Sequence, residues 1–70
     1  MRKNWHEEEC WWGHRYWFCC NFYKATIVYT NGKYNCFIWS DGECVLKFSK
    51  NTLADAQEKC EFAIFALGNE

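Results

Sequence analysis

A chain of 70 residues forms one domain, and a domain this small buries only about 60% of the surface that its unfolded chain exposes, so it depends on a high apolar content. Half of the residues are hydrophobic and 21% are aromatic, which suffices for a core without a metal, a cofactor or a disulfide. A net charge of −1 gives no field for a phosphate backbone, and neither a signal peptide nor a long apolar run is present, so we expect a cytoplasmic protein without nucleic-acid or membrane partners.

An aromatic and cysteine-rich segment, residues 1–22, opens the domain that spans residues 1–70. Asn4 and Glu7 have the spacing of a capping box, which predicts a short helix that stops near Gly13. We expect this segment to fold over an apolar surface of the domain, because its large indole rings need burial. Those rings belong to Trp5, Trp11, Trp12 and Trp17.

The end of this segment, HRYWFCCNF, is rich in residues that favour strands. It predicts an extra strand over residues 15–20, with Asn21 at the bend into the next strand. The alternative is one strand over residues 16–30 with a bulge near Asn21.

A β-meander over residues 23–49 is the strongest pattern in the chain. Asn31-Gly32 and Asp41-Gly42 tolerate the positive φ angles of tight turns, and both lie between runs of β-branched and aromatic residues. A two-residue loop at the first turn pairs Tyr29 with Tyr34, Ile27 with Cys36 and Ala25 with Ile38.

The second hairpin requires a different register if the apolar side of its last strand is to face the core. A three-residue loop, Ser40-Asp41-Gly42, with a type I turn and a glycine bulge satisfies this requirement. It predicts three cross-strand pairs: Cys44 with Ile38, Leu46 with Cys36, and Phe48 with Tyr34.

The last predicted unit spans residues 52–67. It consists of a helix over residues 53–67 and of the residue before it. Thr52 and Asp55 resemble a capping box, and Gly68 ends the run of helix formers. One stripe faces the sheet: Leu53, Ala56, Cys60, Ala63, Ile64 and Leu67. The sequence thus predicts an α+β fold in which a three- to four-stranded antiparallel sheet carries one helix on one face.

Two apolar surfaces remain after helix and sheet cover each other, and we predict that they bind a partner protein or a second copy of the chain as a homodimer. On the sheet face away from the helix they comprise Val28, Phe37, Trp39 and Val45, with Lys24, Lys33 and Lys47 as a rim. On the far side of the helix they comprise Phe62 and Phe65.

Chemistry-bearing residues give weak patterns. His6, Cys10 and His14 recur at helical spacing, with Cys19 or Cys20 as a fourth donor, which is the pattern of a zinc site, but Gly13 interrupts the helix. The same residues could supply a nucleophile and a base, and they are explained more simply as a polar surface, so we predict no catalytic site, no enzyme and no metal. The six cysteines are expected to be reduced thiols, with Cys36, Cys44 and Cys60 buried.

Residues 23–67 resemble small phage- or prophage-encoded cytosolic proteins that have a β-meander followed by one helix. The resemblance is carried by YKATIVY, the aromatic strand ending in Trp39, the Asp41-Gly42 turn and the helix start TLADAQ. It implies a non-enzymatic protein, in some cases an inhibitor of host or defence machinery such as an anti-CRISPR, that occupies a partner's surface. The alternative, suggested by aromatic and lysine residues on one sheet face, is a zinc-stabilised or single-stranded nucleic-acid-binding module.

Overall fold

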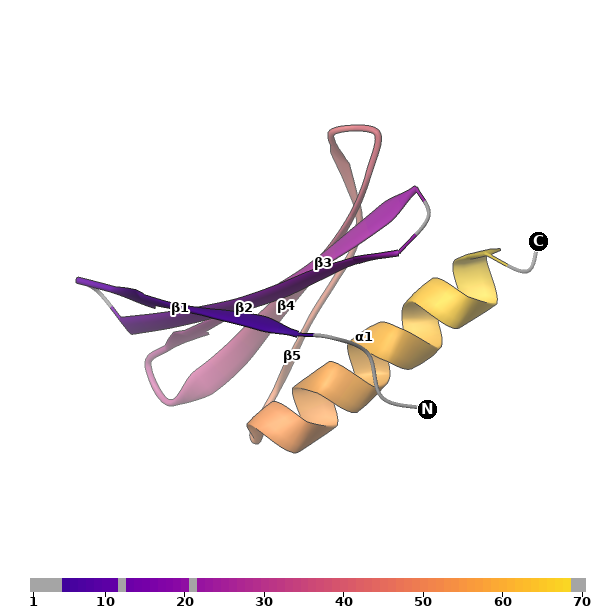
Figure 1. Cartoon of the computed structure of the whole chain (residues 1–70). Helices are drawn as coiled ribbons and strands as arrows, with labels where there is room; N and C mark the ends of the chain where they lie inside the picture. Colours follow the sequence, from indigo (N-terminus) through magenta and orange to yellow (C-terminus); the bar gives the residue numbers. More distant parts are fainter. Residues whose placement is uncertain (1–4, 12, 21, 69–70) are drawn as a thin grey trace.

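The computed structural model describes residues 5–11, 13–20 and 22–68, which form one sheet and one helix (Figure 1). The five antiparallel strands lie in chain order, each beside its neighbour in sequence. They are β1 (His6–Cys10), β2 (Gly13–Cys20), β3 (Tyr23–Thr30), β4 (Lys33–Ser40) and β5 (Glu43–Lys50), and α1 (Leu53–Gly68) follows. The predicted α+β class is confirmed, and the sheet has five strands where three to four were expected.

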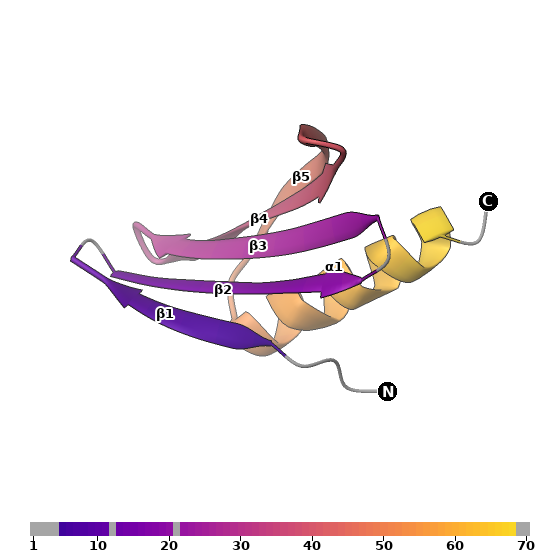
Figure 2. The same cartoon turned by 45° about the horizontal axis from the view of Figure 1, so that its top comes forward.

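The N-terminal segment forms a hairpin at the edge of the sheet, so the predicted short helix is wrong (Figure 2). β1 pairs with β2 from His6 opposite Trp17 to Cys10 opposite Gly13. A helix of under three turns is marginal in water, whereas the strand gains cross-strand contacts such as the bond from Arg15 Nε to Glu8 Oε1, 2.8 Å long. Asn4, the predicted cap, lies outside the described residues.

β2 begins at Gly13, two residues before the predicted start at residue 15. The alternative of a single strand over residues 16–30 is wrong, because β2 and β3 are two strands that pair with each other from Arg15–Val28 to Cys20–Tyr23. Gly13 has a φ of +146°, and a Cβ added there would lie 3.2 Å from the carbonyl oxygen of Tyr29. The close approach of β3 therefore favours glycine at this position.

The register of the first meander hairpin is confirmed. Tyr29 lies opposite Tyr34, and the predicted pairs Ile27–Cys36 and Ala25–Ile38 follow along the strands. Asn31 and Gly32 both have positive φ angles, 54° and 76°, as a type I′ turn requires.

The register of the second hairpin was predicted wrongly. Asp41 and Gly42 form another turn with two positive φ angles, 55° and 82°, so Ser40 pairs with Glu43 across a two-residue loop. The shift of one residue occurs inside β5 instead, where Val45 forms a bulge.

The bulge at Val45 directs the apolar side of β5 toward the core. The prediction had attributed this effect to the turn. Leu46 lies opposite Ile38 and Phe48 lies opposite Cys36. The prediction had placed Leu46 opposite Cys36 and Phe48 opposite Tyr34. Cys44 pairs with Trp39 and is exposed, so the expectation that Cys44 is buried is also wrong.

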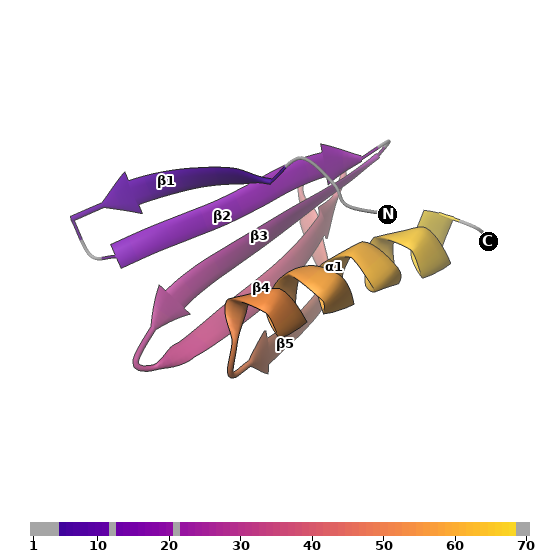
Figure 3. The ribbon, with the colours of Figure 1, turned by 60° about the horizontal axis from the view of Figure 1, so that its bottom comes forward.

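α1 covers one face of the sheet and lies against β3, β4 and β5 (Figure 3). Thr52 caps it as predicted, because the backbone N–H of Asp55 donates to Thr52 Oγ1 at 3.1 Å. The predicted stripe faces the sheet, with its three central residues, Ala56, Cys60 and Ile64, fully or nearly buried. The sheet contributes the rest of the buried core: Phe18, Ala25, Ile27, Cys36 and Ile38.

Candidate functional site: the open face of the sheet

The sheet face away from α1, which we call the open face, is left uncovered by the part of the chain that the structure describes (Figure 2). Because side chains alternate along each strand, the pairing registers place a defined set of residues there. The set is His6, Glu8, Cys10, Arg15, Trp17, Cys19, Lys24, Thr26, Val28, Thr30, Lys33, Asn35, Phe37, Trp39, Cys44, Lys47 and Ser49.

Rings and cations alternate across the middle of the open face. The His6 imidazole stacks on the Trp17 indole with ring centroids 4.3 Å apart, and Lys24 Nζ lies 5.1 Å from the centroid of the same indole. On β4, the rings of Phe37 and Trp39 lie 6.2 Å apart. The Trp17 ring is thus flanked by its own neighbours, whereas Trp39 leaves 37% of its surface exposed for a partner.

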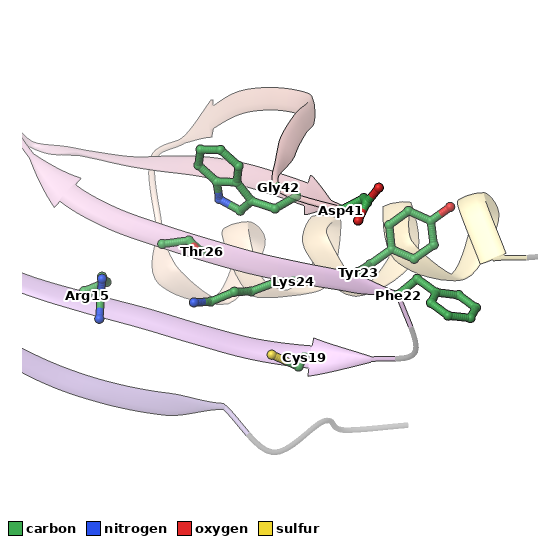
Figure 4. A pocket seen from close by; sticks show the side chains of 9 residues that line it. Arg15, Cys19, Phe22, Tyr23, Lys24, Thr26, Asp41 and Gly42 are labelled. Atoms are coloured by element: carbon green, nitrogen blue, oxygen red, sulfur yellow. The ribbon is translucent and has the colours of Figure 1, made fainter.

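A shallow depression of about 530 Å³ lies beside Trp39 (Figure 4). Arg15 and Cys19 line it from β2, Lys24 and Thr26 from β3, and Phe22 from the turn between these strands. The turn from β4 to β5 closes its far side. The depression combines apolar rings with two cationic groups, Arg15 and Lys24, and with one carboxylate, that of Asp41, which suits an aromatic or polar group of a partner.

Charge is distributed unevenly between the two sides of the molecule, although the whole chain carries only −1. Among the described strand residues, four cations occupy the open face against one carboxylate, Glu8, which is bonded to Arg15, and the turn residue Asp41 adds a second carboxylate at the depression. The cations are Arg15, Lys24, Lys33 and Lys47. Carboxylates dominate α1, with Asp55, Glu58 and Glu61 against Lys59. The open face is therefore basic although the protein as a whole is weakly acidic.

Most of the residues that the sequence analysis predicted to bind a partner lie on the open face. Val28, Phe37, Trp39, Lys24, Lys33 and Lys47 occupy the open face, and Val45 forms the bulge on β5 with 47% of its surface exposed. Phe62 and Phe65 lie on the outer side of α1, 69% and 66% exposed. The two predicted surfaces are thus on opposite sides of the molecule.

Sequence reasoning missed His6, Arg15 and Trp17 on the open face. A two-residue connection from β2 to β3 would have placed Trp17 beside Thr26, but the helix expected for the first residues hid the pairing with His6. The described part of the N-terminal segment does not cover either apolar surface, contrary to the expectation, because its hairpin extends the sheet sideways. Trp11 is 95% exposed, and Trp12 lies outside the described residues.

One tryptophan of this segment does reach the core. The Trp5 ring meets the Phe18 ring edge-on at 4.4 Å between centroids, and its Nε1–H donates to Glu61 Oε2 at 2.8 Å. Trp5 thereby ties the N-terminal hairpin to α1.

The residues that have the spacing of a zinc site in the sequence are not brought together. His6 stacks on Trp17 on the open face, whereas His14 lies on the opposite face, with Nδ1 3.3 Å from Glu7 Oε2. Within residues 5–11, 13–20 and 22–68, no three His, Cys, Asp or Glu side chains are grouped so that they could hold a metal ion.

Among the described residues, three titratable groups on the helix side have shifted pKa values: Tyr16, Cys60 and Cys36, whose pKa is lowered chiefly by its side-chain hydrogen bond with Cys60. Burial, and after it the negative charge of Glu7, raises the pKa of Tyr16 above its usual value. The hydrogen bond to Cys36, together with burial, raises the pKa of the Cys60 thiol. Both cysteines are fully buried as predicted, so Cys60 is a protonated packing residue and not a nucleophile.

The fold and the open face define a two-layer α+β protein whose sheet has one aromatic and basic side uncovered by the described residues. Comparison with protein families, curated protein sequences and solved structures gives no match to this chain. Among the residues described, no helix has the length and apolar character that crossing a membrane would demand.

Proposed function

We propose that this protein is a small non-enzymatic binding module that acts by placing its open face on the surface of a partner protein. The observation that carries the proposal is the course of the N-terminal hairpin, which widens the sheet and leaves the rings of the open face uncovered by the described chain. Large aromatic side chains surrounded by polar and basic ones are typical of protein-binding surfaces.

Within this proposal, Trp39 is the central anchor because it is more exposed than Trp17 and Phe37, the other large apolar rings on the strands of the open face. Phe37 and Val28 provide the apolar floor beside it, and Lys24, Lys33 and Lys47 steer an acidic partner toward the face. The resemblance to phage-encoded β-meander proteins supports a role as a phage accessory protein or anti-defence inhibitor in the host cytoplasm, with a host or defence component as the partner.

The experiment compares the wild type with Trp39→Ala and with the matched control Trp11→Ala in co-purification from bacterial lysate, followed by affinity measurement with the partner recovered. Truncating a tryptophan hot spot costs about 2 kcal/mol or more, so we expect a loss of affinity of about 30-fold or more for Trp39→Ala. Trp11→Ala should bind as the wild type does. Equal binding by all three proteins would refute the proposed site, and unfolding of Trp39→Ala in far-UV circular dichroism would show Trp39 to be a core residue.

Single-stranded nucleic acid is a second candidate partner, favoured by one observation. Lys24 lies over the Trp17 ring and lines the depression beside Trp39, and lysine is depleted from the centres of protein interfaces but common beside stacking aromatics in single-strand-binding sites. A gel-shift series over increasing salt tests it, because phosphate contacts make affinity fall steeply with salt. An unshifted oligonucleotide at low salt would remove this candidate.

A further inference from the structure

The outer side of α1 carries the chemistry that complements the open face. Asp55, Glu58, Phe62 and Phe65 follow one another at intervals of three and four residues, so they form one stripe, which we call the outer stripe. All four are exposed, and the two phenylalanines show 69% and 66% of their surface. Phenyl rings and carboxylates thus lie on one side of the molecule, and indole rings and ammonium groups on the other.

We infer that a second copy of the chain binds the open face, with its outer stripe packed on the rings and lysines of the first copy, so that copies associate head to tail. This inference rests on the proposed function in that it uses the same open face as a binding surface. The inference goes beyond the proposed function by identifying a second copy of the chain as the occupant of the open face.

Charge decides between this arrangement and a symmetric dimer. Two open faces in contact would oppose the cations of both copies, Lys24, Lys33 and Lys47 among them, and two outer stripes would oppose Asp55 and Glu58 of both copies. The head-to-tail contact instead pairs the lysines of one copy with Asp55 and Glu58 of the other. Lys59, beside the outer stripe, is the one cation that α1 contributes against this pattern.

The dimensions of the two surfaces match. A helix of 16 residues is about 24 Å long, and an eight-residue strand of the open face is about 26 Å long. A single helix on a sheet buries less than a standard protein interface does, so we expect weak association. Because the two surfaces lie on opposite sides of the molecule, the contact leaves one free surface at each end and permits further copies to add.

Light scattering or sedimentation, performed from about 10 μM to about 1 mM, tests the inference in the range where weak interfaces associate. We expect the average mass of the wild type to rise from 8.5 kDa beyond twice that value with concentration, and added salt to lower it. Trp39→Ala and the double variant Phe62→Ala/Phe65→Ala should each remain monomeric. Their equimolar mixture should form a two-chain species and stop there, since each variant retains one intact surface.

This mixing experiment separates the possible occupants. A wild type that stays monomeric throughout the range would overturn the inference. The proposed function would still stand if the wild type binds a foreign protein partner and Trp39→Ala does not. A mass that stops at two chains, with no species restored on mixing the variants, would show a symmetric dimer and equally overturn it. Circular dichroism checks folding. Should a variant unfold, Lys24→Glu and Glu58→Lys replace the pair, because both side chains are exposed.

Discussion

The bond between Trp5 and Glu61 is the place where a single substitution tests how the N-terminal hairpin is attached. Trp5→Phe removes the Nε1–H donor that lies 2.8 Å from Glu61 Oε2 and retains an aromatic ring to pack on Phe18. A hydrogen bond to a charged acceptor contributes about 1.5–3 kcal/mol, and partial exposure of this one brings the expected loss to about 1–2 kcal/mol. Trp5→Ala also loses the ring, which adds about half of the 3–5 kcal/mol typical of a fully buried aromatic residue.

The assay is urea unfolding followed by far-UV circular dichroism, with Trp11→Phe as the control. Trp11 is 95% exposed, so its substitution should leave the free energy of unfolding unchanged. A domain of this size has a total stability of only about 3–10 kcal/mol, so a change of 1 kcal/mol is readily measured and shifts Tm by about 4–8 °C.

A double-mutant cycle identifies the interaction itself. If the hydrogen bond causes the loss of stability, Trp5→Phe should lower the free energy of unfolding much less in a Glu61→Gln background, where the charged acceptor is already gone. Equal costs in both backgrounds, or a Trp5→Phe variant as stable as Trp11→Phe, would refute the claim that this bond holds the hairpin to α1.

Three further predictions concern the backbone, a phenol and a thiol. Gly13→Ala should lower the free energy of unfolding by about 1–3 kcal/mol, because Gly13 has positive φ and its new Cβ would crowd a carbonyl, whereas Gly68→Ala has open space and should be neutral; equal urea midpoints would contradict this. Tyr16 has a raised pKa in the folded state, so stability should be constant below about pH 10 and fall as the pH rises further, and an ultraviolet titration without a late-ionising tyrosine would argue against it. Thiol reagents should label exposed Cys44 in the native protein but reach Cys60 only on unfolding, and mass spectrometry that finds Cys60 labelled as fast as Cys44 would contradict the packing described above.

Local sequence determined the parts of the fold that depend on neighbouring residues. Asn31-Gly32 specified the first meander turn, and the two-residue loop then fixed the register of β3 and β4. Thr52 specified the start of α1, and the apolar spacing that follows it specified which side of the helix is buried.

Tertiary structure alone decided whether residues 6–10 form a helix or a strand, where the second hairpin shifts its register, and whether the open face is covered. His6–Cys10 becomes a strand because β2 offers it a partner with a matching ring and a matching charge. The shift falls at Val45 because both the turn at Asp41 and the packing of Phe48 against the core must be satisfied in one strand. Each outcome depends on contacts between segments distant in sequence, whose energies no local pattern contains.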